Sequence, residues 1–239
     1  MIPLKDSIPH REFPFINYLL IGINCIIFIY ETSLSPVELE MLFYHYGLVP
    51  ARYTHPIWAT IAGLSPNNYL PFFTNLFLHG GWLHIIGNMW FLLIFGDNVE
   101  DRLGHAKYLI FYLLCGIGAN LVHFWVNPNS TIPTVGASGA ISGIMGAYLL
   151  LFPFSRIITF IPIFFIPYFI EIPAIFYILI WFFMQLFSGM FSLAMPYASS
   201  NIAFFAHIGG FVIGLLILPL LKNRDYRKLY PDEFYFTNY

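Results

Sequence analysis

Six apolar segments recur along the 239-residue chain, and they restrict it to a membrane fold. A helix that crosses a bilayer needs about 20 apolar residues, with a range of about 17–25. Only 9% of the residues are charged, whereas a soluble domain carries about 25%. We therefore predict an all-α integral membrane protein with six transmembrane helices. The expected spans are approximately Phe15–Tyr30, Trp82–Gly96, Ala106–Val126, Ser138–Phe152, Ala174–Phe191 and Ile202–Leu221.

The segments between the expected spans differ in character. Leu34–Gly81 is too apolar for a solvated linker and too interrupted by proline for one helix, so we predict a long membrane-associated loop with short helices. Pro153–Pro173 contains four prolines, which a helix does not tolerate, and we expect it at the membrane interface. Asp97–His105 is expected as a polar turn, and Ser192–Asn201 as a loop.

The basic residues are distributed unevenly among these connections. Cytoplasmic connections of membrane proteins carry an excess of Lys and Arg. With six spans, only Arg52 of the 10 basic residues falls on the outer side. This asymmetry predicts that both termini lie in the cytoplasm. We also expect a bacterial inner (plasma) membrane protein with a membrane domain over residues 1–221 and a polar tail over residues 222–239. The residues on the cytoplasmic side are Lys5, Arg11, Arg102, Lys107, Arg156, Lys222, Arg224, Arg227 and Lys228.

The expected helix that begins at Ser138 has one face of small residues. On a wheel of 3.6 residues per turn, Gly139, Ser142 and Gly143 fall on the same half as Ser138. Small residues let membrane helices approach closely. Contact with a similar stripe on the last expected span would bring the Ser138 hydroxyl near the imidazole of His207. That second stripe consists of Ala203, His207, Gly210 and Gly214.

Several polar side chains lie where the bilayer makes them costly, and such residues are usually functional. His84 and Asn88 are four residues apart, so they share a helix face. At about 1.5 Å per residue, they lie at a depth similar to that of Ser138 and His207, near the outer ends of their helices. His207 could then activate Ser138 as a base. Asn88, His84 and the free N–H groups at the helix start could stabilise an oxyanion.

Other interpretations of these residues stay open at this point. The small-residue stripes and the serines could serve helix packing alone, and the polar residues could belong to a transporter. A transporter predicts inverted repeats and broken helices near the midplane, and the sequence contains no internal repeat. No cluster of Cys, His or carboxylates suggests a metal, and no glycine loop suggests a nucleotide, so we expect no cofactor. The net charge of −2 gives no argument for nucleic acid.

At these residues, from about His79 to Gly214, the chain resembles the rhomboid family of intramembrane serine proteases. Four patterns of the family occur in order and on the expected helices, and the set is far more specific than any one pattern. The Gly-x-Ser-Gly pattern reads Gly136-Ala137-Ser138-Gly139, and the paired-histidine pattern reads His79, His84 and Asn88. The glycine–glutamate pattern reads Gly96, Glu100 and Gly104, and the last pattern reads Ala206, His207, Gly210 and Gly214.

The resemblance implies a six-helix bundle with a Ser138–His207 dyad and no third carboxylate. It also implies an oxyanion and substrate-binding site formed by the Ser138 N–H, His84, Asn88 and Gly136. The implied reaction is hydrolysis of peptide bonds in or near transmembrane segments of other proteins, in contact with the lipid bilayer. Substrate would enter from the lipid side, with the fifth span and the loop Ser192–Asn201 as movable parts. The alternative is an inactive family member that binds client transmembrane helices.

Two features depart from the family. Ser142 stands where many rhomboids carry a Tyr stacked on the dyad histidine, and the first loop has no clear Trp-Arg pair. We expect His79 to support the first loop, and Glu100 to bind backbone N–H groups of an adjacent loop. Glycines complete the predicted structural support: Gly139, Gly143, Gly210 and Gly214. Three further polar residues have no assigned role: Asn120, His123 and Gln185.

Overall fold

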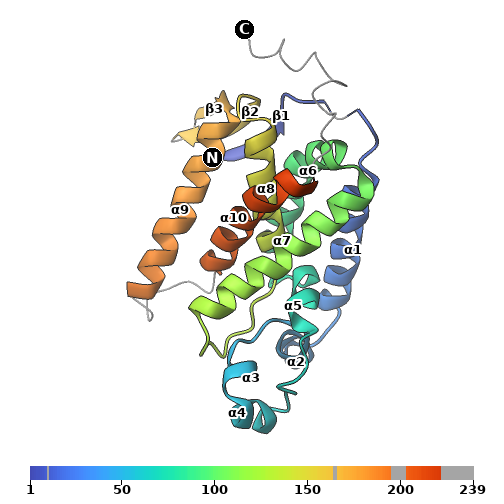
Figure 1. Cartoon of the computed structure of the whole chain (residues 1–239), viewed down its shortest axis with the longest axis vertical. Coiled ribbons are helices and arrows are strands. Elements are labelled where there is room, and N and C mark those ends of the chain that lie inside the picture. The colour runs from blue at the N-terminus through green and yellow to red at the C-terminus, as the bar shows by residue number, and fades with distance from the viewer. Residues whose placement is uncertain (10, 164–165, 195–202, 222–239) are drawn as a thin grey trace.

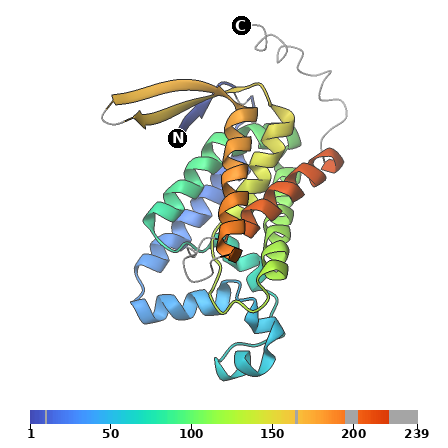
Figure 2. The ribbon, with the colours of Figure 1, turned by 90° about the vertical axis from the view of Figure 1, so that its left-hand side faces the viewer.

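Long helices make up most of the chain and pack side by side in one bundle (Figures 1 and 2). In this computed structural model, the described residues are 1–9, 11–163, 166–194 and 203–221. The helices are α1 (Phe15–Thr32), α2 (Pro36–Tyr46), α3 (Ala51–Thr54), α4 (Pro56–Ile61), α5 (Pro71–Thr74), η1 (Asn75–Phe77), α6 (Trp82–Leu103), α7 (His105–Val126), α8 (Ser138–Leu151), α9 (Ala174–Ala194) and α10 (Phe204–Leu221). The strands are β1 (Ile2–Asp6), β2 (Arg156–Ile163) and β3 (Ile166–Pro173).

Four helices are long and apolar enough to cross a membrane, namely α1, α7, α9 and α10. They correspond to the first, third, fifth and sixth expected spans, which are confirmed as apolar helices of spanning length. α6 meets the same standard only together with the preceding segment Pro71–Phe77, from which it is bent by 91°. α8 has only 14 residues. The count of six spans therefore stays a prediction.

α8 lies inside the bundle, enclosed by other helices. Every residue from Gly139 to Tyr148 is buried, and α6, α7 and α10 pack around the helix (Figure 1). A helix that is apolar on all sides is normally covered on all sides. Neighbouring helices, rather than lipid, therefore surround most of α8.

A three-stranded antiparallel sheet overturns the all-α prediction for one part of the chain. The segment Pro153–Pro173, expected as an irregular interface segment, contains the hairpin β2–β3, which projects from one end of the bundle (Figure 2). β1 pairs with β2, so the strand order is β1-β2-β3. The prolines exclude a helix but not a hairpin, because Pro162 and Pro167 lie opposite each other near its tip. Proline is tolerated at such positions, where few ladder hydrogen bonds are lost.

The predicted polar turn Asp97–His105 is also wrong for most of its length, because α6 continues to Leu103. Its polar side chains have partners on other elements. The Asn98 amide donates to the Asp6 carboxylate (2.8 Å), and the Glu100 carboxylate accepts backbone N–H groups from the start of α1. Gly104, with a φ of 77°, ends the helix, as glycine commonly does.

The first loop contains the short helices α2 to α5 and η1, as predicted. Arg52 in α3 is buried, and its guanidinium donates to the carbonyl oxygens of Tyr44 (3.1 Å) and His45 (3.2 Å) at the end of α2. These bonds fix α3 to α2. The location of this loop at the membrane interface stays a prediction.

The ends of several elements meet at one end of the bundle. β1, the end of α6 and the start of α7 lie there, whereas α3 lies at the opposite end (Figure 1). The Lys107 ammonium donates to the carbonyl oxygen of Leu221 (3.1 Å), which adds the end of α10 to the same end. This arrangement agrees with the predicted charge asymmetry, which sets Arg52 apart. Residues 195–201 of the predicted loop Ser192–Asn201 and the tail 222–239 lie outside the described residues.

Candidate active site

Ser138 is the first residue of α8, and the chain approaches it through a constrained segment. The Gly136 N–H donates to the carbonyl oxygen of Asn75 (2.8 Å), and Leu48 and Thr134 exchange backbone hydrogen bonds. The φ of Gly136 is +130°, a region that side chains rarely adopt. A Cβ at Gly136 would also lie 2.7 Å from His84 Nε2. Glycine is therefore required here by both backbone angle and space.

The small-residue faces of α8 and α10 meet as predicted. A Cβ on Gly210 would lie 1.9 Å from the carbonyl oxygen of Gly139, and one on Gly214 would lie 2.2 Å from that of Gly143. A Cβ on Gly139 would lie 2.7 Å from Ala119 Cβ of α7. The two backbones are thus in direct contact, and only glycine permits this spacing.

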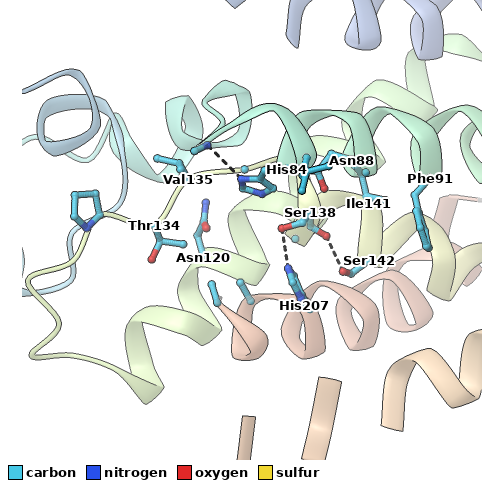
Figure 3. Close-up of a pocket in the computed structure, with 18 of the residues that line it drawn as sticks. His84, Asn88, Phe91, Asn120, Thr134, Val135, Ser138, Ile141, Ser142 and His207 are labelled. Atoms are coloured by element: carbon cyan, nitrogen blue, oxygen red, sulfur yellow. Dashed lines mark hydrogen bonds between the residues drawn. The ribbon is translucent and has the colours of Figure 1, made fainter. Parts of the chain in front are cut away.

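This contact brings the predicted nucleophile and base together. His207 Nε2 lies 2.8 Å from Ser138 Oγ (Figure 3), which is within the range for proton transfer. On the other side of the ring, Nδ1 lies 2.8 Å from Oε1 of Gln185 in α9. A neutral imidazole has one donor and one acceptor nitrogen. With the Ser138 hydroxyl donating to Nε2, Nδ1 carries the hydrogen and donates to Gln185.

His84 and Asn88 project from α6 toward the same space (Figure 3). The Gly80 N–H donates to His84 Nδ1 (3.3 Å), so the hydrogen of a neutral ring is on Nε2, which can donate. The Asn88 Nδ2 atom is buried and has no hydrogen-bond partner among the described residues. An unpaired buried donor costs free energy. Two donors are therefore available to an oxygen atom that carries negative charge.

A cavity of about 600 Å³ connects these groups, since Ser138, His207, His84, Asn88 and Gly136 all line it. The first N–H groups of α8 have no intrahelical acceptor, and no side-chain cap binds them. Apolar side chains complete the wall, among them Phe91, Ile141, Met145 and Trp181. The cavity therefore combines a hydroxyl, a base and several donors within a largely apolar lining.

His79 and Glu100, two of the predicted support residues, make different contacts. The His79 ring is buried and packs edge-on against the His84 ring, with centroids 5.2 Å apart. Its nitrogens have no hydrogen-bond partner in the described part of the chain, whereas its backbone N–H donates to the Glu31 carboxylate (3.2 Å). Glu100 accepts the N–H groups of Ile16 (2.9 Å) and Asn17 (2.7 Å). These belong to the first turn of α1, not to a loop as predicted.

Ser142 does not contact His207 as an aromatic residue at this position would. Its hydroxyl donates to the carbonyl oxygen of Ser138 (2.6 Å), one turn earlier in α8. The aromatic ring near His207 comes instead from Trp181 of α9, with centroids 6.2 Å apart and planes inclined by 36°. α9 therefore supplies two neighbours of the imidazole, the Trp181 ring and the Gln185 amide, whereas α8 provides no aromatic ring at Ser142.

The residues without an assigned role find partners in the structure. Asn120 forms a reciprocal amide pair with Asn75 (3.0 and 2.7 Å), and His123 Nε2 lies 3.0 Å from the Thr134 hydroxyl. The Thr134 contact ties the segment before Ser138 to α7, and the Asn75 pair ties η1 to α7. The only signal in the sequence was an isolated polar residue in an apolar segment, which does not identify its partner.

Comparison with known proteins adds a separate observation. The family model described as Rhomboid domain matches residues 66–224. The chain is similar to Rhomboid-like protein 11, chloroplastic, of Arabidopsis thaliana (42% identical over 79 residues, 33% of this chain and 28% of that protein). It is similar to RHOMBOID-like protein 1 of the same organism (31% over 145 residues, 61% and 32%). It is also similar to Rhomboid-like protease 3 of Toxoplasma gondii (30% over 124 residues, 52% and 41%). The matches span less than half the length of each of these relatives.

Proposed function

Since this chain belongs to the rhomboid family, we propose that it is an intramembrane serine endopeptidase that cleaves peptide bonds in or near transmembrane segments of other membrane proteins. Ser138 is the nucleophile and His207 the base. The observation that carries the proposal is the distance of 2.8 Å between Ser138 Oγ and His207 Nε2. This pair lines a cavity together with Asn88, whose Nδ2 atom has no hydrogen-bond partner among the described residues.

The first half of the reaction forms an acyl-enzyme. Ser138 Oγ attacks the carbonyl carbon of the scissile bond while its proton passes to His207 Nε2. The carbonyl oxygen becomes an oxyanion and accepts hydrogen bonds from Asn88 Nδ2, His84 Nε2 and the backbone N–H of Ser138. As the carbon–nitrogen bond breaks, His207 gives its proton to the leaving amine.

The second half reverses the roles. A water molecule donates a proton to His207 Nε2 and its oxygen attacks the acyl carbon. The oxyanion forms again in the same position, and the bond to Ser138 Oγ then breaks as His207 returns the proton to it. The enzyme is thereby restored, and no cofactor is needed for the balance of atoms or charge.

The chain is an integral membrane protein, and the finer topology belongs to the proposal. We place α6 and α8 across the membrane in addition to α1, α7, α9 and α10, which gives six spans and both termini in the cytoplasm. The elements that meet at one end of the bundle carry four basic residues, which supports this orientation: Lys5 in β1, Arg102 in α6, Lys107 in α7 and Arg156 in β2. We also propose that this membrane is a bacterial inner membrane. The similar proteins do not decide the membrane, because one of them is named as chloroplastic.

The test is cleavage of a single-span membrane substrate together with labelling by a fluorophosphonate. Ser138→Ala and His207→Ala should both abolish cleavage and labelling at unchanged expression. Ser142→Ala is the matched control, because it removes a hydroxyl one turn away on the same helix, and it should keep the label. Cleavage that persists in Ser138→Ala would contradict the proposal. Binding of the substrate without any labelling of the wild type would favour the inactive client-binding alternative.

A further inference from the structure

The base of a serine hydrolase must present one particular nitrogen to the hydroxyl. A neutral imidazole has two tautomers, and its ring can also rotate. Only a ring with its bare nitrogen toward Ser138 can take the proton. The other nitrogen then carries hydrogen, and a fixed acceptor at that position selects the productive tautomer.

Gln185 supplies such an acceptor from a different helix. Its Oε1 lies 2.8 Å from His207 Nδ1, on the side of the ring opposite to Ser138. The amide presents its oxygen, because Nδ1 carries the hydrogen. The three groups Ser138, His207 and Gln185 thus form one line of hydrogen bonds across α8, α10 and α9.

The position of Gln185 is fixed by close contacts on both sides of it along α9. Trp181, one turn before, lies against the rings of His207 and Phe211, with centroids 6.2 and 6.3 Å away. Gly189, one turn after, lets α9 approach α10, since a Cβ there would lie 3.3 Å from the Phe205 ring. Residues four apart share a helix face. The face of α9 that contains Gln185 therefore rests on α10 next to His207.

We infer that Gln185 is a positioning residue for His207: its amide oxygen accepts the Nδ1 hydrogen and holds the imidazole with Nε2 toward the Ser138 hydroxyl. This inference rests on the proposed function. It also accounts for Ser142, which leaves His207 without an aromatic support from α8. An amide suits this location, because it fixes the tautomer without a carboxylate, whose charge would be costly inside a membrane.

The experiment compares two substitutions of Gln185 in the full-length protein, with the single-span substrate and across a range of pH. Gln185→Met keeps the length and unbranched shape of the side chain but has no acceptor of comparable strength. Gln185→Glu keeps the acceptor and adds charge when ionised. Phe187→Leu is the control for packing of the same helix, because Phe187 is 67% exposed and is not among the residues that line the cavity.

We expect Gln185→Met to lower kcat by about 10–100-fold, the loss seen when the hydrogen-bond partner of a metal-bound histidine is removed, with a smaller change in KM. We expect Gln185→Glu to retain cleavage and to move the acid limb of its pH profile to higher pH, because a carboxylate stabilises the imidazolium. Phe187→Leu should match the wild type. If the side chain at position 185 did not face His207 Nδ1, the introduced carboxylate would leave the acid limb in place.

Wild-type kcat in Gln185→Met, or an unchanged acid limb in an active Gln185→Glu, would overturn the inference and leave the proposed function standing. If Gln185→Met does not fold, the pH profile of Gln185→Glu decides the matter alone. A wild-type protein that shows neither cleavage nor labelling would refute the proposed function, and the role of Gln185 with it.

Discussion

The contact between α8 and α10 can be tested by adding one methyl group. In Gly210→Ala, the new Cβ would lie 1.9 Å from the carbonyl oxygen of Gly139. Ordinary contact begins at 3.4 Å, so the two helices must separate by about 1.5 Å at this point. The obstacle is backbone on both sides, and no side chain can rotate to relieve it. Such overpacking costs about 1–3 kcal/mol of stability.

The separation acts on the dyad because His207 lies one turn before Gly210. Transferred to the site, it would lengthen the 2.8 Å contact between Ser138 Oγ and His207 Nε2 to about 4 Å, beyond the reach of proton transfer. A displacement of about 1 Å can cost about 10²-fold in rate. We expect Gly210→Ala to lose cleavage by at least that factor while it still folds. The measurements are kcat, fluorophosphonate labelling and thermal unfolding in detergent.

Gly22→Ala provides the matched control for glycine replacement in a membrane helix. A Cβ at Gly22 of α1 meets no atom within 4 Å, so the activity of this variant should equal that of the wild type. Its stability should be no lower, because alanine favours a helix more than glycine does. A Gly210→Ala protein with wild-type cleavage and unfolding temperature would refute the reasoning. It would mean that the two backbones do not touch in the working protein.

Three further predictions follow from other contacts. Asn88→Ala should lower kcat by about 10²–10³-fold, as loss of an oxyanion donor does, and a kcat equal to the wild type would exclude Asn88 from that role. Burial raises the pKa of the Asp6 carboxyl from 3.8 to about 7, although its hydrogen bond from the Tyr148 hydroxyl acts in the opposite direction. Between these pH values the folded protein holds a proton that the unfolded chain has released, so stability should fall as pH rises through this window. Asp6→Asn should remove that slope in thermal unfolding, and an unchanged slope would contradict the assignment. Glu100→Ala should lower the stability by about 1–3 kcal/mol, because it leaves buried N–H groups of α1 unpaired. Its folded fraction should still label, whereas loss of the label in folded protein would contradict a purely structural role.

The residues of the site could be predicted because a membrane sequence makes polar residues conspicuous. His84 and Asn88 stand out in an apolar helix, and their spacing of four places them on one face. The small-residue stripes predicted the contact of α8 and α10, since close approach requires glycine on both helices. Gln185 was equally conspicuous, yet its role could not be predicted. Its contact depends on which face of α9 rests on α10, and an apolar helix of uniform composition does not encode that.

The hairpin β2–β3 and the end of α6 show a different limit. Both errors came from residues that were interpreted locally. Prolines in Pro153–Pro173 excluded a helix, but pairing with β1, more than 150 residues earlier in the chain, decided the strand. The charged end of α6 was predicted to be a turn, but in the structure it is helical and its Glu100 carboxylate binds the first turn of α1. In both cases, contacts with residues distant in the sequence stabilise the observed structure. The periodicity of the sequence carries no information about these contacts.

The geometry of the dyad is determined by two kinds of contact with different consequences. The distance between Ser138 and His207 is set by the direct contact of the α8 and α10 backbones. At Gly139 and Gly210 this contact is too close for the two helices to move nearer or to accept a side chain. The orientation of the imidazole is set by side chains of α9, a helix whose other face is exposed at Phe183, Met184 and Phe187. Movement of α9 would therefore release the Nδ1 contact before it changed the distance between nucleophile and base. Because we expect α9, the fifth span, to move when substrate enters, the productive tautomer of His207 would be restored only when α9 returns to α10.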